Sequence, residues 1–158
     1  MNSPTATVDR VDADSALLAR STLTRIDHVD AHVLRTDGDL SRTPEQWARE
    51  ILEHPPAAVR LRLRAGWTAL GIALHHGRPD TIAGWPITGN TAEFLRLQSD
   101  SRIGLHGQLI TRLSDQGVTF ATLVELGNPV ARMVWAKVLP GHLRTVRSLM
   151  EGAAQRTT

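Results

Sequence analysis

The chain has 158 residues, 41% of them hydrophobic and 22% charged, a composition typical of a single globular domain with a substantial core. Lys and Arg number 18 against 16 Asp and Glu, and the resulting net charge of +2 argues against the concentrated basic surface that nucleic-acid binding requires. The absence of Cys excludes disulfides, thiolate nucleophiles and Cys-ligated metal centres.

The sequence predicts neither a membrane segment nor a targeting signal. The longest uncharged, apolar-leaning run covers residues 66–77, which is too short to span a bilayer. The first 20 residues have no basic region followed by an apolar core, as a signal peptide requires. We therefore expect a cytoplasmic protein that does not bind membranes.

The start of the chain predicts a tail followed by a strand. Residues 1–14 mix Ser, Thr, Pro and Asp without a hydrophobic period, so we expect a flexible N-terminal tail there and a single domain over residues 15–154. Residues 28–34 alternate imperfectly between polar and apolar side chains, as a strand does. The strand is followed by a turn at Asp37-Gly38.

Two helices are predicted after this strand. Thr43 and Gln46 fit a capping box around Pro44, and apolar residues then recur at helical spacing. Pro56 can open a second helix, whose apolar stripe recurs at spacings of four, four and three residues, at Val59, Leu63, Trp67 and Leu70. Residues 60–64 also alternate in polarity, which leaves a strand as the alternative for that segment.

The second half of the chain predicts an antiparallel meander and a closing helix. Four strand-like segments are separated by short turn signals, and connections this short favour antiparallel neighbours. These segments are residues 81–88, 92–99, 102–113 and 118–126. Asn128 then caps, and Pro129 begins, a long helix with an apolar stripe and an expected kink at Pro140.

At residues 94–106, 119–125 and 135–142 the chain resembles the START-like superfamily, which includes polyketide cyclases, lipid-transfer domains and plant hormone-binding proteins. Residues 94–106 are similar to the central hairpin of its small bacterial members, and residues 119–125 lead into the final helix as they do there. Within that helix Trp135, Pro140 and His142 match the pattern W-x-x-x-x-P-x-H. The resemblance implies an α+β helix-grip fold, in which a curved antiparallel sheet wraps around a long C-terminal helix and encloses a largely apolar cavity.

The implied cavity defines a set of candidate ligand-binding residues with aromatic, aliphatic or small polar side chains. They are Trp67, Trp85, Phe94, Leu105, Leu109, Phe120, Thr122 and Trp135. Core packing is the alternative for the tryptophans on the helical stripes. Trp85 differs from them, because a flanking glycine and proline place it near a strand start, where it could gate a pocket mouth or cover a core edge. A buried indole N–H needs a partner, and a ligand carbonyl can supply one.

His106 is the candidate for proton transfer, because an imidazole titrates near neutral pH. Strand alternation points it away from the more apolar face of residues 103–113, unless one of the nearby glycines introduces a bulge. Glu125 and Asp37 are the candidate orienting carboxylates. Their alternative roles are an exposed or Arg-paired residue and an ordinary turn residue, respectively.

The sequence predicts no metal site and no cofactor. His28 and His32 share a strand face, but they stand about 13 Å apart along a strand, too far to hold one ion directly. The chain contains no H-E-x-x-H motif and no phosphate-binding glycine loop. Any catalysis is therefore expected to use side chains alone.

The expected function is the binding of a hydrophobic or aromatic metabolite. Its catalytic form would be a cofactor-free cyclisation, dehydration or isomerisation in secondary metabolism. A non-catalytic carrier or sensor is the second alternative. The third is a structural homodimer with a filled core, formed through the Arg-rich second helix or a sheet edge. A cavity of several hundred Å³ would favour the two ligand-binding alternatives, and a filled interior would favour the third.

Overall fold

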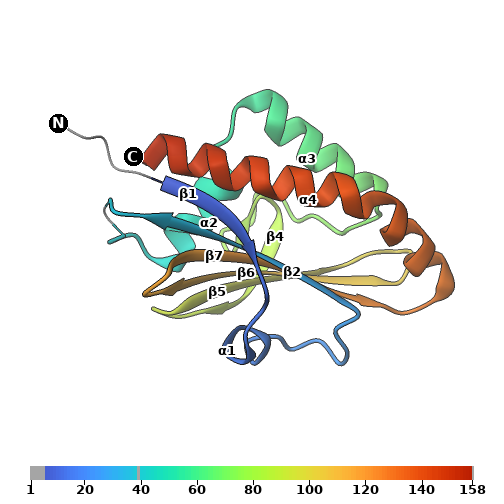
Figure 1. The fold of residues 1–158 in the computed structure, drawn as a ribbon. Coiled ribbons are helices and arrows are strands. Elements are labelled where there is room, and N and C mark those ends of the chain that lie inside the picture. The colour runs from blue at the N-terminus through green and yellow to red at the C-terminus, as the bar shows by residue number, and fades with distance from the viewer. Residues whose placement is uncertain (1–5, 39, 158) are drawn as a thin grey trace.

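A computed structural model describes residues 6–38 and 40–157 of the chain (Figure 1). Within these residues the chain forms seven strands and four helices. In chain order they are β1 (Ala6–Val11), α1 (Ser15–Leu18), β2 (His28–Thr36), α2 (Pro44–Leu52), α3 (Ala57–Ala69), β3 (Thr81–Ile82), β4 (Trp85–Asn90), β5 (Phe94–Asp100), β6 (Leu105–Ser114), β7 (Gly117–Leu126) and α4 (Pro129–Thr157).

The strands form one antiparallel sheet in the order β1-β2-β7-β6-β5-β4-β3. The predicted meander is confirmed, because β4 to β7 are neighbours in chain order. The single strand predicted for residues 81–88 is wrong, because a turn at residues 83–84 divides it into β3 and β4. The first predicted strand, β2, pairs with the last strand of the meander, with His28 opposite Val124 and Leu34 opposite Val118. The expected α+β class, with an antiparallel sheet and a long C-terminal helix, is also confirmed.

The flexible tail predicted for residues 1–14 is wrong for residues 6–11, which form β1 at the edge of the sheet. Residues 1–5 lie outside the described residues. The backbone of β1 pairs with β2 from Ala6 opposite Thr36 to Val11 opposite Ala31. Among residues 6–11, Val8 is the one buried side chain. The sequence of β1 therefore shows little hydrophobic pattern. Backbone hydrogen bonds can hold an edge strand whose side chains contribute little burial.

The helix starts predicted from the sequence are confirmed. In α2 the Thr43 side chain accepts from the Gln46 backbone N–H, and the Gln46 side chain accepts from the Thr43 backbone N–H, as a capping box requires. Residues 60–64 lie within α3, so the strand alternative for them is wrong. The side chains of the predicted apolar stripe pack against the main core and are partly buried. No residue of α3 is fully buried.

The long C-terminal helix α4 is anchored at both of its ends. At its start, Asn128 Oδ1 accepts from the Ala131 N–H at 2.8 Å, and Asn128 Nδ2 donates to the Ile103 carbonyl at 2.9 Å. Near its end, Arg156 Nε donates to Glu50 of α2 at 2.6 Å. Pro140 lies inside α4, and Figure 1 shows the first turns of the helix set at an angle to the rest.

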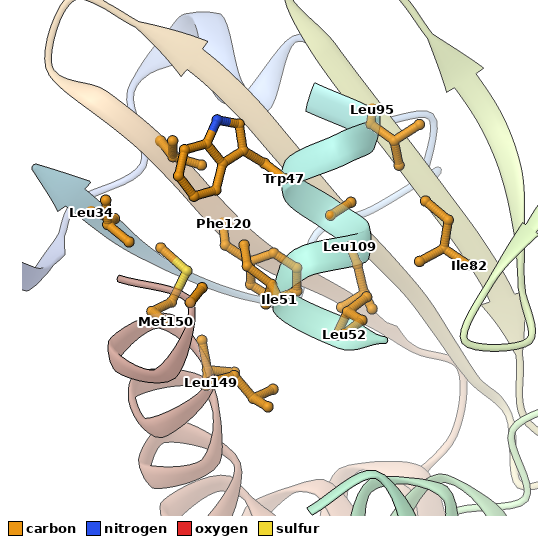
Figure 2. Close-up of a cluster of buried hydrophobic side chains, with 14 of the residues drawn as sticks. Leu34, Trp47, Ile51, Leu52, Ile82, Leu95, Leu109, Phe120, Leu149 and Met150 are labelled. Atoms are coloured by element: carbon orange, nitrogen blue, oxygen red, sulfur yellow. The ribbon is translucent and has the colours of Figure 1, made fainter. Parts of the chain in front are cut away.

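Both faces of the sheet are covered. On one face α2 and α4 pack over the main core, and Figure 2 shows side chains of α2, α4 and the sheet meeting there. On the other face the N-terminal segment contributes Leu17, which packs against Ala31, Ile110 and Leu123. Within residues 6–38 and 40–157, no helix combines the length and the apolar character needed to cross a membrane.

Candidate cavity and histidine–aspartate cluster

A cavity of about 780 Å³ lies between the sheet, α3 and α4. Its floor is made by alternate residues of β6 and β7, all of them buried, namely Leu105, Gly107, Leu109, Thr122 and Val124. The exposed residues that line it belong to α3 and α4. The cavity therefore opens between these two helices, while the sheet closes its inner side.

Two tryptophans form one wall of the cavity. Trp85 and Trp67 meet edge to face, with ring centroids 5.6 Å apart. Trp85 lies over Gly107, where an added Cβ would stand 3.3 Å from the Trp85 Cη2 atom. The missing side chain at Gly107 therefore leaves the space that the indole occupies. Trp85 follows a two-residue turn at Ala83 and Gly84, both with positive φ, which is the geometry of a tight hairpin.

Three polar atoms of the cavity lining are buried and lack a hydrogen-bond partner within the described part of the chain. They are the indole Nε1 atoms of Trp85 and Trp135 and the hydroxyl Oγ1 of Thr122. A buried polar group without a partner costs about 1–3 kcal/mol. A bound molecule that carries hydrogen-bond acceptors would remove this cost.

A histidine–aspartate cluster stands beside the cavity. The Asp30 side chain is fully buried on β2, and its Oδ2 lies 2.7 Å from His28 Nε2 and 2.9 Å from His142 Nε2. Because an ionised carboxylate only accepts hydrogen bonds, both imidazoles donate to it. Burial acts to raise the pKa of Asp30, but the hydrogen bonds from His142 and His28 outweigh it and hold that pKa below its ordinary value.

His32 extends the cluster along β2. Its Nδ1 lies 3.8 Å from Asp30 Oδ1, and both of these atoms lack a hydrogen-bond partner among the described residues. Burial lowers the pKa of His32 and outweighs the opposing effect of the Asp30 charge. The cluster thus combines a buried carboxylate, two imidazoles that donate to it and a third imidazole whose pKa is lowered by burial.

His142 connects this cluster to the cavity, because it lines the cavity while bound to Asp30. Its ring lies 5.1 Å from the Trp135 ring, which packs against His28 at the same centroid distance. With Nε2 donating to Asp30, the other ring nitrogen accepts a proton in neutral imidazole and donates one in the cation. His142 therefore links the buried Asp30 carboxylate to the cavity lining.

Six of the eight predicted ligand-binding residues line the cavity, namely Trp67, Trp85, Leu105, Leu109, Thr122 and Trp135. The other two do not. Phe94 lies on the opposite face of the sheet, where the Arg20 guanidinium stands 4.8 Å from its ring. Phe120 is buried in the main core beneath α2, as Figure 2 shows.

The three predicted catalytic residues lie outside the cavity lining. His106 is on the other face of β6, where its Nδ1 lies 2.7 Å from Asp100 Oδ1. Continuous pairing of β6 with both neighbours keeps the strand alternation intact, so no bulge turns His106 inward. Glu125 is opposite His106 in the register and accepts from the Arg25 N–H at 3.0 Å. Asp37 is exposed in the bend after β2.

Sequence reasoning missed Asp30 and His142. The signal was the alternation His28-Val29-Asp30-Ala31-His32, which puts three titratable side chains on one strand face. The imperfect alternation of this strand does not show which of its faces is buried. Both faces are buried here, because the N-terminal segment covers one of them. Within the described ranges, no group of His, Asp or Glu is arranged to hold a metal ion.

Comparisons with models of known families, with curated proteins and with solved structures give no significant match for this chain.

Proposed function

We propose that the protein binds a hydrophobic or aromatic small molecule in the cavity between the sheet and α4. The observation that carries this proposal is a space of about 780 Å³ walled by Trp67, Trp85 and Trp135. Small-molecule sites are concave, mostly apolar and of this size, with a few polar groups that orient the ligand. The unpaired indole N–H groups and the Thr122 hydroxyl are such groups.

We also propose that the fold is the helix-grip fold of the START-like superfamily. The support is the element order, in which β2, α2 and α3 come before the meander and the long helix α4 comes after it. The position of the cavity, between the sheet and this last helix, fits the same proposal.

A titration with N-phenyl-1-naphthylamine, a neutral aromatic dye whose fluorescence rises in apolar sites, tests the binding proposal. We expect saturable binding that Gly66→Phe weakens about tenfold or more, or about 1.4 kcal/mol. Gly66 lines the cavity mouth, and an added Cβ there meets nothing within 4 Å among the described residues, so the new ring can enter the opening. Ala65→Phe, its exposed neighbour outside the lining, is the matched control. Absence of saturable binding by the unmodified protein would refute the proposal.

A catalytic form of this function is favoured by the hydrogen bond between His142 and Asp30. In an isomerisation, neutral His142 would accept a proton from the carbon beside a substrate carbonyl, and the C–H electron pair would pass into an enolate. A proton then returns to carbon and restores the imidazole. Asp30 would act as a positioning group that orients the ring and stabilises its cation. The enolate oxygen would accept from an unpaired indole N–H.

Exchange of hydrogen for deuterium next to the carbonyl of 2-tetralone, followed by NMR in D₂O, separates the catalytic form from a carrier. We expect the protein to accelerate the exchange and His142→Gln to abolish the acceleration, because an amide can donate to Asp30 but cannot act as the base. His106→Gln, on the outer face of the sheet, should leave the rate unchanged. Saturable binding of 2-tetralone without accelerated exchange would favour the carrier or sensor.

A further inference from the structure

Three cations line the mouth of the cavity. Arg62 belongs to α3, and Lys137 and Arg144 belong to α4, and all three side chains are exposed. Lys137 and Arg144 are seven residues apart, which places them on one face of the helix about 10 Å from each other along its axis. Because α3 and α4 both line the cavity, positive charge stands on both sides of the opening.

Among the residues that the structure describes, no Asp or Glu accompanies these cations in the cavity lining. Arg62, Lys137 and Arg144 also form no ion pair within the described ranges, although eight other arginines of the chain do. The paired arginines show that carboxylates are available elsewhere on this nearly neutral chain. The mouth therefore carries an uncompensated positive charge, which attracts anions.

The interior differs from the mouth in both polarity and charge. Its walls are mainly tryptophan and aliphatic side chains, and the buried Asp30 carboxylate stands behind His142. Asp30 disfavours a second negative charge in the interior, whereas the three cations favour one at the opening. A molecule that satisfies both regions places its apolar body inside and its anionic group outside.

We infer that the ligand is an anionic amphiphile, with an apolar or aromatic body inside the cavity and a carboxylate, sulfonate or phosphate group held by Arg62, Lys137 and Arg144. This inference rests on the proposed function, namely that a small molecule occupies the cavity. It adds the chemical class of that molecule and the direction in which it enters.

A matched pair of dyes tests the inference. 8-Anilinonaphthalene-1-sulfonate is N-phenyl-1-naphthylamine with one added sulfonate, so the ratio of their dissociation constants isolates the effect of the charge. At low salt we expect the sulfonate dye to bind about tenfold more tightly, and salt to reduce this advantage by screening. The triple variant Arg62→Gln, Lys137→Gln, Arg144→Gln should lose the advantage while it binds the neutral dye as before.

The triple variant Arg60→Gln, Arg64→Gln, Arg78→Gln is the control. It removes the same charge from exposed residues outside the cavity lining and should keep the preference for the sulfonate dye. Equal affinity of the unmodified protein for both dyes, or equal losses in the two triple variants, would overturn the inference but leave the binding function standing. Failure to bind either dye would instead refute the binding function itself.

Competition with unlabelled anions separates an amphiphile from a free anion. We expect dodecanoate to displace both dyes, because it needs the apolar interior as well as the cations. Inorganic phosphate should displace neither dye beyond the effect of sodium chloride at the same ionic strength. If phosphate displaced the sulfonate dye but not the neutral dye, and dodecanoate displaced neither, the cavity mouth would bind free anions and not an amphiphile. That result would overturn the inference.

Discussion

Asp30 Oδ2 accepts a hydrogen bond from His142 Nε2 at 2.9 Å, although 112 residues separate them in the sequence. This bond joins β2 to α4 and places a fully buried carboxylate directly behind an imidazole of the cavity wall. The same carboxylate oxygen accepts from His28, so two strongly polar groups depend on one anion. The stability of the fold and the chemistry of the cavity thus rest on the same side chain.

Asp30→Asn should reduce the free energy of unfolding at pH 7 by about 1–3 kcal/mol, because the two imidazoles lose their charged acceptor. It should also flatten the acid side of the stability profile. The folded pKa of Asp30 lies below the ordinary 3.8, so its contribution is complete above that pH and is lost as the pH falls through the folded value. Urea unfolding at pH 7, 5 and 3 measures both effects.

Asp115→Asn, in the exposed turn between β6 and β7, is the control for this substitution. It should change the unfolding free energy by no more than about 0.5 kcal/mol at any of these pH values. If Asp30→Asn kept the wild-type pH profile, the proposed anchoring role of Asp30 would be wrong.

His32 should make the protein less stable as the pH falls below about 6.5. Its pKa is lowered in the folded state, so in this range the unfolded chain binds a proton that the folded protein does not. The unfolding free energy then falls by at most about 1.4 kcal/mol per pH unit until the folded pKa is reached. His32→Gln removes this titration, and the difference in slope between the two proteins from pH 7 to pH 5 measures it. Identical slopes would contradict the assignment.

Local signals predicted most of the fold. The capping box at Thr43 and Gln46 and the cap at Asn128 mark helix starts through hydrogen bonds between near neighbours, which a sequence displays directly. The meander could be predicted for a similar reason, because short turns bring consecutive strands together. By contrast, β1 could not be recognised, since its pairing with β2 depends on backbone groups that carry no sequence pattern.

Part of the cavity lining could be predicted from the sequence, but the pairing of Asp30 with His142 could not. Strand alternation correctly placed Leu105 and Leu109 on the strand face opposite to His106. The structure places both leucines in the cavity lining. The partnership of Asp30 with His142 depends on where α4 lies across β2, which no local pattern specifies. An acidic residue on a strand, such as Asp30, is expected to face solvent unless both faces of the sheet are known to be covered.

Gly107→Val should destabilise the protein by about 1–3 kcal/mol, because the new side chain occupies the space of the Trp85 ring. The contact of 3.3 Å between an added Cβ and Trp85 Cη2 leaves little room even for alanine. The displaced indole should also change the near-ultraviolet circular dichroism and weaken binding of the neutral dye. Gly66→Ala, at an open helical position, should instead be neutral or stabilising. Equal unfolding free energies for Gly107→Val and the wild type would show that Trp85 does not need this space.

Arg156→Gln should release the last turns of α4 from α2. Arg156 donates to the Glu50 carboxylate at 2.6 Å and to the Glu50 carbonyl at 2.7 Å, and Glu50 is mostly buried. Loss of this partner leaves a poorly compensated carboxylate, so we expect a cost of about 1–3 kcal/mol and faster amide exchange in residues 150–157. Arg147→Gln, which breaks an exposed pair with Glu151, should cost less than about 0.5 kcal/mol. Because the cavity lining ends at Leu149, dye binding should survive in both variants, and its loss in Arg156→Gln would mean that the anchor also shapes the cavity.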